Sequence, residues 1–334
     1  MKAAIVRAPG TDPEYGEFAE PEVERGAVRV HVSAAALSHV TRSRASGSHY
    51  SSEGQYPFVP GLDGTGRVDD GGRVYFVMPP APWGSLAERT AVPKQRCIPL
   101  PDDLDDATAA AIANPGMSSW AALTERARLE RGETVLVNGA TGAAGSLAVK
   151  IARHLGAGKV IATGRNVEVL GSLGADVTIP LTDHREALES AFRAQFAAGV
   201  GVVLDYLWGA SAECLLIAAA KSGAEAVPIR YVEIGSASGQ EIALPSAVLR
   251  SSAIVLMGSG IGSVPPARLL DAIAGVLNAA VPAGLRLATT SVPLARVTEN
   301  WATADAGGRV VFTVGQPTHS SSSRNPSPLA RHGT

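Results

Sequence analysis

Apolar and polar positions form short strand-like segments in the first part of the chain. Residues 2–6 are a short apolar run, and residues 28–32 alternate apolar and polar with the period of two that a half-buried strand shows. Residues 67–68 and 73–77 are two further strand candidates. Glycines and prolines between these segments disfavour helices. The first 110 residues therefore predict a β-rich domain with a Greek-key or barrel-like arrangement.

The pattern changes near residue 104. An Ala-rich segment begins at Asp105-Asp106, where acidic residues suit a first helical turn. From residue 133 onward, apolar runs alternate with helical periodicity. The expected strands are 135–137, 160–163, 177–179, 202–204, 227–234 and 254–257, and the expected helices are 147–155, 166–173, 184–198, 211–221 and 267–279. Continuous apolar strands between helices are typical of a parallel sheet covered on both faces, so a doubly wound α/β domain is predicted.

The end of the chain returns to the first pattern. We expect β-like segments at 285–287 and 310–314 that rejoin the first domain, because chain termini often pack together. Residues 316–334 are rich in Ser, Pro and Asn and are predicted to form a disordered tail.

Composition narrows the class of protein. The 334 residues suggest two domains, and a net charge of −2 gives no electrostatic reason to expect nucleic acid or anionic lipid as a partner. We see no signal peptide and no apolar run of about 18 residues, so we expect a cytoplasmic protein. Cys97 and Cys214 cannot build a disulfide framework or a four-thiolate zinc site and are interpreted as small buried residues.

The most informative motif is a glycine-rich turn between a predicted strand and a predicted helix. Gly142 would let the backbone approach a pyrophosphate, and Gly145 would let the helix pack on the strand. The helix N-terminus would then offer free N–H groups to the phosphates. Ala140 stands where the first glycine of the dinucleotide fingerprint is expected, and the alternative is a tight turn without a ligand. The candidate cofactor-binding residues here are Gly139, Thr141, Gly142, Ala143, Ala144 and Gly145.

The end of the second predicted strand bears on the type of cofactor. An NAD site usually has Asp or Glu there for the ribose 2′-hydroxyl, but this chain has Gly164, Arg165 and Asn166. Arg165 can meet a 2′-phosphate with forked, charge-assisted hydrogen bonds. The motif therefore favours NADPH over NADH, with a solvated loop arginine as the alternative interpretation.

Further candidates follow the later strands of the predicted sheet. In open α/β sheets the carboxyl ends of strands face the ligand crevice. Tyr206 and Trp208 would wall the nicotinamide or the acceptor there, unless they only pack in the core or an interface. Glycines after the next two strands would allow close approach of the nicotinamide ribose. These candidates are Gly235, Ser236, Gly258 and Gly260.

Several short motifs, in order, resemble one family. They are 60–66 (PGLDGTG), 83–88 (WGSLAE), 116–120 (GMSSW), the turn at 139–145, 173–176 (LGAD) and 308–311 (GRVV). In this order and spacing the chain resembles the medium-chain dehydrogenase/reductase superfamily, and most closely its zinc-independent quinone oxidoreductase branch, the relatives of zeta-crystallin.

The resemblance implies a particular division of the chain. Residues 1–115 and 260–315 would form a β-rich, GroES-like catalytic domain, and residues 116–259 a Rossmann domain that binds NADPH. The active site would lie in the cleft between them. The resemblance also implies a homodimer formed through the strand at 254–257.

The zinc-dependent branch of the superfamily requires particular metal ligands. It needs a His-Glu pair just after the Pro-Gly turn, where this chain has Asp63-Gly64, and residues 36–39 contain no cysteine. His39 and Asp63 alone would be only two ligands. We therefore expect no metal, and no simple alcohol dehydrogenation, which needs a Lewis acid.

Without a metal or an evident acid–base pair, the cofactor must carry the reaction. Hydride transfer from NADPH to a quinone or an α,β-unsaturated carbonyl fits this constraint, and an enoyl reductase is a close variant. The phenols of Tyr50 and Tyr56 could donate to the acceptor carbonyl, although both could equally be packed or exposed loop residues. Asn114 could hydrogen-bond substrate or cofactor, or simply form a turn.

Two positions depart from the pattern of the family. Ser38 and Thr41 stand where quinone oxidoreductases commonly have Asn and Asp. This departure keeps a second hypothesis open: a non-catalytic NADPH-binding protein, or a fold reused for another biosynthetic reaction.

Overall fold

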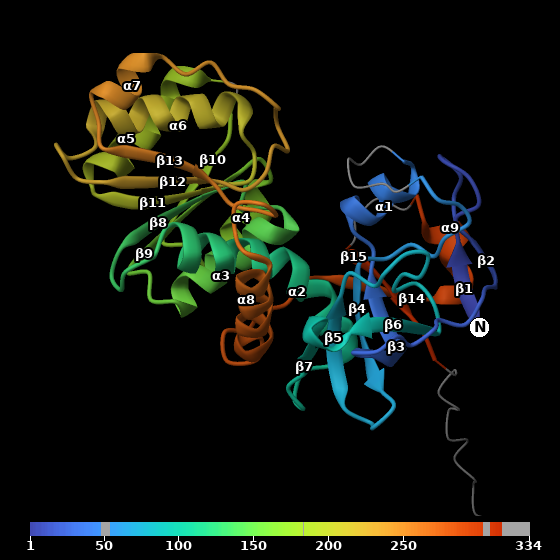
Figure 1. The fold of residues 1–334 in the computed structure, drawn as a ribbon. Coiled ribbons are helices and arrows are strands. Elements are labelled where there is room, and N and C mark those ends of the chain that lie inside the picture. Colours follow the sequence, from blue (N-terminus) through green and yellow to red (C-terminus); the bar gives the residue numbers. More distant parts are fainter. Residues whose placement is uncertain (48–53, 183, 303–307, 316–334) are drawn as a thin grey trace, which may run out of the picture.

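Two sheets organise the molecule. The computed structural model describes residues 1–47, 54–182, 184–302 and 308–315. Helices α2 (Asp106–Ala121) and α8 (Pro266–Ala279) lie between the two sheets (Figure 1). The predicted fold class, a β-rich domain plus a doubly wound Rossmann domain, is confirmed.

The first sheet has six parallel strands in the order β10-β9-β8-β11-β12-β13. Its strands are β8 (Thr134–Asn138), β9 (Lys159–Gly164), β10 (Val177–Pro180), β11 (Val200–Asp205), β12 (Ile229–Glu233) and β13 (Ile254–Gly258). The helices of this part are α3 (Ala143–His154), α4 (Val167–Ser172), α5 (Arg185–Ala197), α6 (Gly209–Ser222) and α7 (Ser246–Arg250). In order along the chain this is the 3-2-1-4-5-6 arrangement of a dinucleotide-binding fold.

Both faces of the parallel sheet are covered, and for this reason its strands read as continuous apolar runs. Val135 and Val137 pack in one core cluster with residues of α2, α3 and α8. Leu136, which points to the opposite face, packs in a second cluster with residues of α5 and α6.

The second sheet is mostly antiparallel, in the order β14-β15-β3-β4-β5-β7, with β6 paired to β3. Its strands are β3 (Ala27–Ala36), β4 (Asp63–Val68), β5 (Arg73–Val77), β6 (Arg89–Pro93), β7 (Cys97–Pro99), β14 (Thr289–Pro293) and β15 (Arg309–Thr313). Short helical turns lie at Lys94–Arg96, Ala122–Arg126 and Leu294–Arg296, and α9 spans Val297–Asn300. The last strand pairs with β3, so the end of the chain rejoins the first sheet as predicted.

Two local predictions were wrong. No strand forms at 285–287. Leu285 is fully buried in the cluster that contains α8, and its N–H donates to the Ala280 carbonyl at 2.8 Å. Leu285 is therefore apolar because it packs in a turn after the helix. A helix, α1 (His39–Ala45), forms among residues expected to hold only strands and turns. The Ser38 side chain accepts from Thr41 N at 3.1 Å and caps it.

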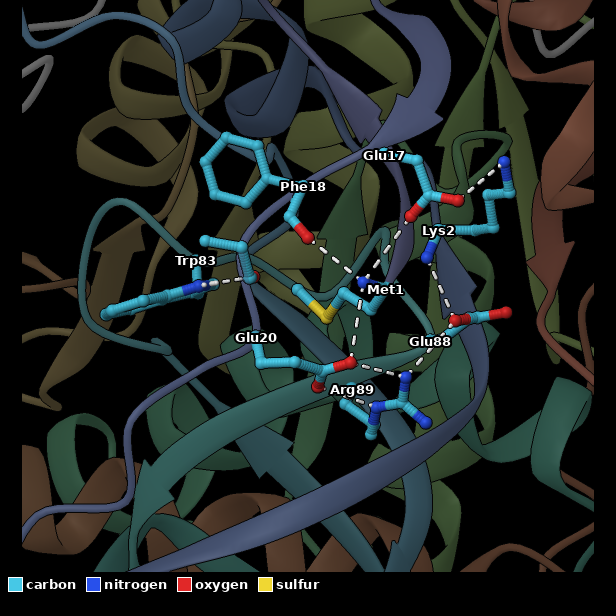
Figure 2. A network of polar contacts seen from close by, with 9 residues as sticks. Met1, Lys2, Glu17, Phe18, Glu20, Trp83, Glu88 and Arg89 are labelled. Atoms are coloured by element: carbon cyan, nitrogen blue, oxygen red, sulfur yellow. Dashed lines mark hydrogen bonds and ion pairs between the residues drawn. The ribbon is translucent and has the colours of Figure 1, made fainter.

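A polar network ties the β1–β2 hairpin to the rest of the β-rich part (Figure 2). β1 (Lys2–Ile5) and β2 (Glu14–Glu17) pair antiparallel. The Met1 ammonium donates to the Phe18 carbonyl at 3.0 Å and lies 3.4 Å from Glu20, which in turn accepts two hydrogen bonds from Arg89. These contacts anchor the first strand by its end.

The boundary predicted between residues 115 and 116 falls within α2. This helix contacts β3, β4 and β15 on one side and α3 and α8 on the other. The division of the chain into domains stays a prediction, and the tail at 316–334 lies outside the described residues. Within the described residues, no helix is both long and apolar enough to span a bilayer.

Candidate active site

The structure brings the predicted cofactor-binding segments together at one end of the parallel sheet. Asn138 pairs in register with Thr163 and with Asp205, the last residue of β11. Asp205 aligns with Glu233, and Glu233 with Gly258. Since the strands are parallel, the segments that follow them start from the same carboxyl end. These segments are 139–145, 164–166, 206, 235–236 and 258–260.

The glycine-rich turn has the local geometry that phosphate binding requires. Gly139 adopts a left-handed φ of +89°, and its N–H donates to Thr163 Oγ1 at 3.2 Å. A Cβ at Gly145 would lie 2.2 Å from the Gly139 carbonyl oxygen, so only glycine lets α3 start this close. At the exposed Gly142 a Cβ would meet only that same oxygen, at 3.7 Å. The turn is therefore tight on its inner side and open on its outer side.

The other residues of this turn begin α3 or support the turn. Ala143 and Ala144 are the first two residues of the helix, whose first N–H groups have no partner within it. Thr141 packs over Gly164, where a Cβ would come within 2.4 Å of Thr141 Cγ2. The end of β9 is thereby fixed beside the turn.

Arg165 lies beside this turn, directly after β9. Its side chain is exposed and makes no hydrogen bond or ion pair with the residues that the structure describes. The next residue, Asn166, uses its Oδ1 to accept from Val169 N at 3.1 Å and caps α4. The Arg165 guanidinium is thus available for a ligand next to the turn, whereas the side-chain oxygen of Asn166 already caps α4.

The remaining cofactor candidates lie after β11, β12 and β13. The Tyr206 hydroxyl is buried without a hydrogen-bond partner in the described structure, and burial raises the pKa of Tyr206 to about 12, against smaller effects of Ser118 and Ser119. A Cβ at Gly235 would lie 3.2 Å from the Tyr206 carbonyl oxygen. Ser236 accepts from Gln240 at 3.1 Å. Gly258 and Gly260 face open space.

A buried polar cluster that the sequence analysis missed holds these strand ends. Asp205 is fully buried and accepts four hydrogen bonds: from Tyr231 at 2.6 Å, from Asn138 at 2.7 Å, and from the N–H groups of Leu207 and Trp208 at 2.9 and 3.2 Å. Burial raises the pKa of Asp205, and each of these donors lowers it. The carboxylate therefore connects β8, β11 and β12 at the end of the sheet where the glycine-rich turn begins.

A second buried carboxylate, also missed, lies in the other sheet. Asp63, the first residue of β4, accepts from the Tyr75 hydroxyl at 2.6 Å. Burial raises the pKa of Asp63, whereas Tyr75, Arg309 and Asn114 lower it. Asn114 is therefore placed beside this carboxylate, on the helix between the two sheets. The residues around Asp63 lie far apart in the sequence, so no local motif predicts that they come together.

The tyrosine candidates have different outcomes. Tyr50 lies outside the described residues. Tyr56 packs edge-on against Phe58, with ring centroids 5.4 Å apart, in the β-rich part of the molecule. It also borders a hollow lined by Arg44, Gln55 and Pro82. No described contact joins Tyr56 to the parallel sheet, and its catalytic role stays a prediction.

Metal ligands do not gather in the described part of the chain. Across residues 1–47, 54–182, 184–302 and 308–315, no three His, Cys, Asp or Glu side chains come close enough to hold one ion. His39 begins α1 at the surface, and Asp63 is bonded to Tyr75.

Comparison with known proteins identifies the family. No protein-family model matches the chain. The chain is 29% identical to a probable NADPH-dependent quinone reductase of Emericella nidulans, over 93% of this chain and 99% of that protein. It is 33% identical to a chloroplastic NADPH-dependent alkenal/one oxidoreductase of Arabidopsis thaliana, over 48% of this chain and 47% of that protein.

A solved structure extends the likeness to the whole fold. The quinone oxidoreductase of Thermus thermophilus, also solved with NADPH, superposes with a TM-score of 0.76 at 28% identity, over 94% of this chain and 100% of that chain. The chain belongs to the medium-chain dehydrogenase/reductase superfamily, in its quinone reductase branch.

Proposed function

We propose that this protein is an oxidoreductase that transfers hydride from NADPH to a quinone or an α,β-unsaturated carbonyl. The observation that carries the proposal is the open glycine-rich turn with the free Arg165 guanidinium beside it. The whole-length relative named as an NADPH-dependent quinone reductase, and the half-length relative named as an alkenal/one oxidoreductase, support both the cofactor and the class of acceptor.

The residues of the turn fit a dinucleotide. The N-terminus of α3 and the open Gly142 would hold the pyrophosphate, and Arg165 would hold the 2′-phosphate. Gly258 and Gly260, which have open space where a side chain would be, would leave room for the nicotinamide ribose. The Asp205 cluster keeps the ends of β8 and β11 in place while these groups bind.

NADPH supplies the hydride, so the chain itself needs only to position the acceptor and polarise its carbonyl. Asn114 is better placed for this role than Tyr56, because it lies on α2, which contacts β3, β4 and β15 of the second sheet and the helices α3 and α8. Its amide can donate a hydrogen bond to a carbonyl oxygen. Tyr50 and Tyr56 remain candidates for the same role.

We further propose that the reaction needs no zinc. The support is the residue set: Asp63-Gly64 replaces the His-Glu pair of the zinc-dependent branch, and Asp63 is already engaged by Tyr75. Conjugation activates a quinone or an enone for hydride attack, so the acceptor does not require a Lewis acid.

The test of the cofactor assignment is a fluorescence titration of the purified protein with NADPH and with NADH. Loss of a charge-assisted, forked contact is expected to weaken NADPH binding about 10- to 100-fold in Arg165→Ala, with little change for NADH. Arg153→Ala is the matched control, since the Arg153 guanidinium is paired with Asp176 at 2.9 Å. If neither nucleotide binds the wild type, the proposed function fails.

A panel of quinones and enones then tests the reaction. NADPH oxidation with at least one acceptor is the expected result. Tight binding with no turnover on any acceptor would favour the alternative, a non-catalytic NADPH-binding protein. That alternative has one structural observation in its favour: the Ser38 and Thr41 hydroxyls, which stand at the substrate-contact positions of the family, lie 2.9 Å apart and serve the cap of α1.

We also propose a homodimer through β13. This strand is the last of the parallel sheet, and its Val255 and Leu256 are 46% and 37% exposed. Pairing with a second β13 would satisfy the free backbone N–H and C=O groups of the edge and place side chains of the partner strand beside Val255 and Leu256 on the two faces of the sheet. Leu256→Lys is expected to give a monomer by light scattering. Val167→Lys, at an apolar residue of α4 that is 61% exposed, is the matched control and should leave the dimer intact.

A further inference from the structure

A relay of hydrogen bonds crosses the carboxyl ends of three neighbouring strands and ends at the glycine-rich turn. Asp205 Oδ1, on β11, accepts from Asn138 Nδ2, on β8, at 2.7 Å. Asn138 Oδ1 accepts in turn from the hydroxyl of Thr163, on β9, at 2.7 Å. Thr163 Oγ1 then accepts from Gly139 N, in the turn, at 3.2 Å. Asn138, Thr163 and Asp205 are all fully buried, so the relay is shielded from water.

The donors of the relay all point in the same direction, toward the carboxylate. Asp205 Oδ1 also accepts from two backbone N–H groups of the loop after β11, so it acts as an acceptor and faces the nitrogen of the Asn138 amide. The same nitrogen donates to Ser211 Oγ at 2.9 Å. The Asn138 oxygen is thereby turned toward Thr163, whose hydroxyl donates its single proton to it. A lone pair of Thr163 Oγ1 is left for the Gly139 N–H.

The relay fixes the residue at which the turn leaves β8. Gly139 adopts a left-handed φ of +89°, and its N–H is directed to the Thr163 side chain. The next N–H, that of Ala140, donates to the Thr163 carbonyl at 2.7 Å. The Gly139 carbonyl oxygen would lie only 2.2 Å from a Cβ at Gly145, so the peptide at Gly139 touches the first turn of α3. A rotation of this peptide would therefore move the helix N-terminus, whose free N–H groups are the donors for a phosphate.

Asp205 restrains the same glycine by a second route. It accepts from Leu207 N at 2.9 Å, and the Leu207 side chain packs against the turn, where a Cβ at Gly139 would lie 2.8 Å from Leu207 Cγ. Tyr231 donates to the other carboxylate oxygen, Oδ2, and belongs to neither route. The cluster thus contains both a path that reaches the turn and a contact that does not.

We propose that Thr163 is a positioning residue for the phosphates of NADPH: its hydroxyl, oriented by Asn138 and Asp205, holds the Gly139 N–H inward and so sets where the turn and the start of α3 meet the pyrophosphate. Thr163 is fully buried and acts through the turn. This inference rests on the proposed function for the place of the pyrophosphate, but the hydrogen bond to Gly139 can be measured without a nucleotide.

The binding test compares Thr163→Val with Thr163→Ser in fluorescence titrations with NADPH. Valine has a similar shape but no hydroxyl, so the Gly139 N–H and Asn138 Oδ1 both lose their partner. We expect the Kd for NADPH to rise about 5- to 10-fold. Serine keeps the hydroxyl, so its Kd should stay within about twofold of the wild type. Equal weakening in both variants, or none in Thr163→Val, would overturn the proposal. If Thr163→Val does not fold, Thr163→Ala takes its place with the same expected rise.

A matched control separates positioning from general loss of stability. Tyr231→Phe removes the 2.6 Å hydrogen bond to Asp205 Oδ2 and leaves the relay at Oδ1 in place. We expect the Tm to fall in both Tyr231→Phe and Thr163→Val, but the Kd for NADPH to rise only in Thr163→Val. If Tyr231→Phe weakens binding as much as Thr163→Val does, the role of Thr163 is merely structural and the proposal fails.

A second readout follows the turn without any nucleotide, by amide hydrogen exchange of the full chain. In Thr163→Val the Gly139 amide should exchange about 10-fold faster, because it has lost its acceptor. Ala140 is the internal control, since its N–H donates to the backbone carbonyl of Thr163, which the substitution leaves in place. Unchanged exchange at Gly139, or equal acceleration at Ala140, would overturn the proposal. If the wild type binds no nucleotide but this local change is seen, the proposed function fails and only the role of Thr163 in ordering the turn stands.

Discussion

Two buried aspartate–tyrosine pairs, one in each sheet, differ in how the rest of the carboxylate is used. Both hydroxyl–carboxylate distances are 2.6 Å, and both carboxylates are buried. Asp205 accepts three more hydrogen bonds besides that of Tyr231. Asp63 accepts none besides that of Tyr75 within the described structure, and its Oδ1 stays unpaired.

The difference separates a carboxylate with both oxygens hydrogen-bonded from a carboxylate with one buried oxygen that has no donor in the described structure. Both oxygens of Asp205 accept hydrogen bonds from groups of the strand ends, three at Oδ1 and one at Oδ2, so the role of Asp205 in holding these ends together accounts for its burial. Asp63 keeps one buried oxygen without a donor in the described structure, and its hydrogen bond with Tyr75 does not remove that cost. Similar residues in similar burial thus differ in how completely the fold provides donors for them.

The largest expected effect is that of Asp205→Ala. This change leaves the Tyr231 hydroxyl, the Asn138 amide and two backbone N–H groups without their acceptor. Breaking such a buried charged network is expected to lower the free energy of unfolding by about 3–5 kcal/mol. Asp63→Ala, where only one donor loses its acceptor, should cost less, about 1–3 kcal/mol. Urea unfolding followed by circular dichroism measures both, and equal losses would break the comparison.

The two tyrosines give the next effect, in the opposite order. Tyr231→Phe leaves Asp205 with three donors, so we expect a loss of about 1 kcal/mol. Tyr75→Phe leaves the Asp63 carboxylate with no hydrogen bond in the described structure, so a larger loss of about 2–3 kcal/mol is expected. The same unfolding experiment decides. A greater loss for Tyr231→Phe would show that Asp63 has donors beyond those described.

The sequence predicted the parallel sheet better than the β-rich part, and for a physical reason. Strands buried on both faces must be apolar throughout, so β8, β9 and β11 stand out without any knowledge of their neighbours. In the β-rich part, local patterns compete with tertiary contacts. The helix α1 begins at a serine cap among turn-forming residues, and Leu285 serves a turn against α8 where a strand was expected.

The candidate site was also predictable only in part, and for the same reason. The glycine-rich turn is a contiguous motif, and the structure places it at the carboxyl end of the sheet with Arg165 beside it. The Asp63 group draws its members from β4, β5, α2 and β15, and no spacing in the sequence brings Arg309 next to Asp63. Only the pairing of β15 with β3, and of β3 with β4, creates that proximity.

The smallest expected effect is a pH dependence that distinguishes Asp63 from its surroundings. Burial raises the pKa of Asp63, and Tyr75, Arg309 and Asn114 oppose the shift without cancelling it. A carboxyl with a raised pKa in the folded state favours folding when protonated, so its contribution is lost as the pH rises from the unfolded value, about 3.9, through the folded pKa. Asp63→Asn lacks this loss. Its free energy of unfolding, relative to wild type, should therefore increase as the pH rises above about 4 in paired urea titrations. If the curves of wild type and Asp63→Asn against pH are parallel, the pKa of Asp63 is the same in the folded and the unfolded state. The contrast with Asp205 would then rest on hydrogen-bond geometry alone.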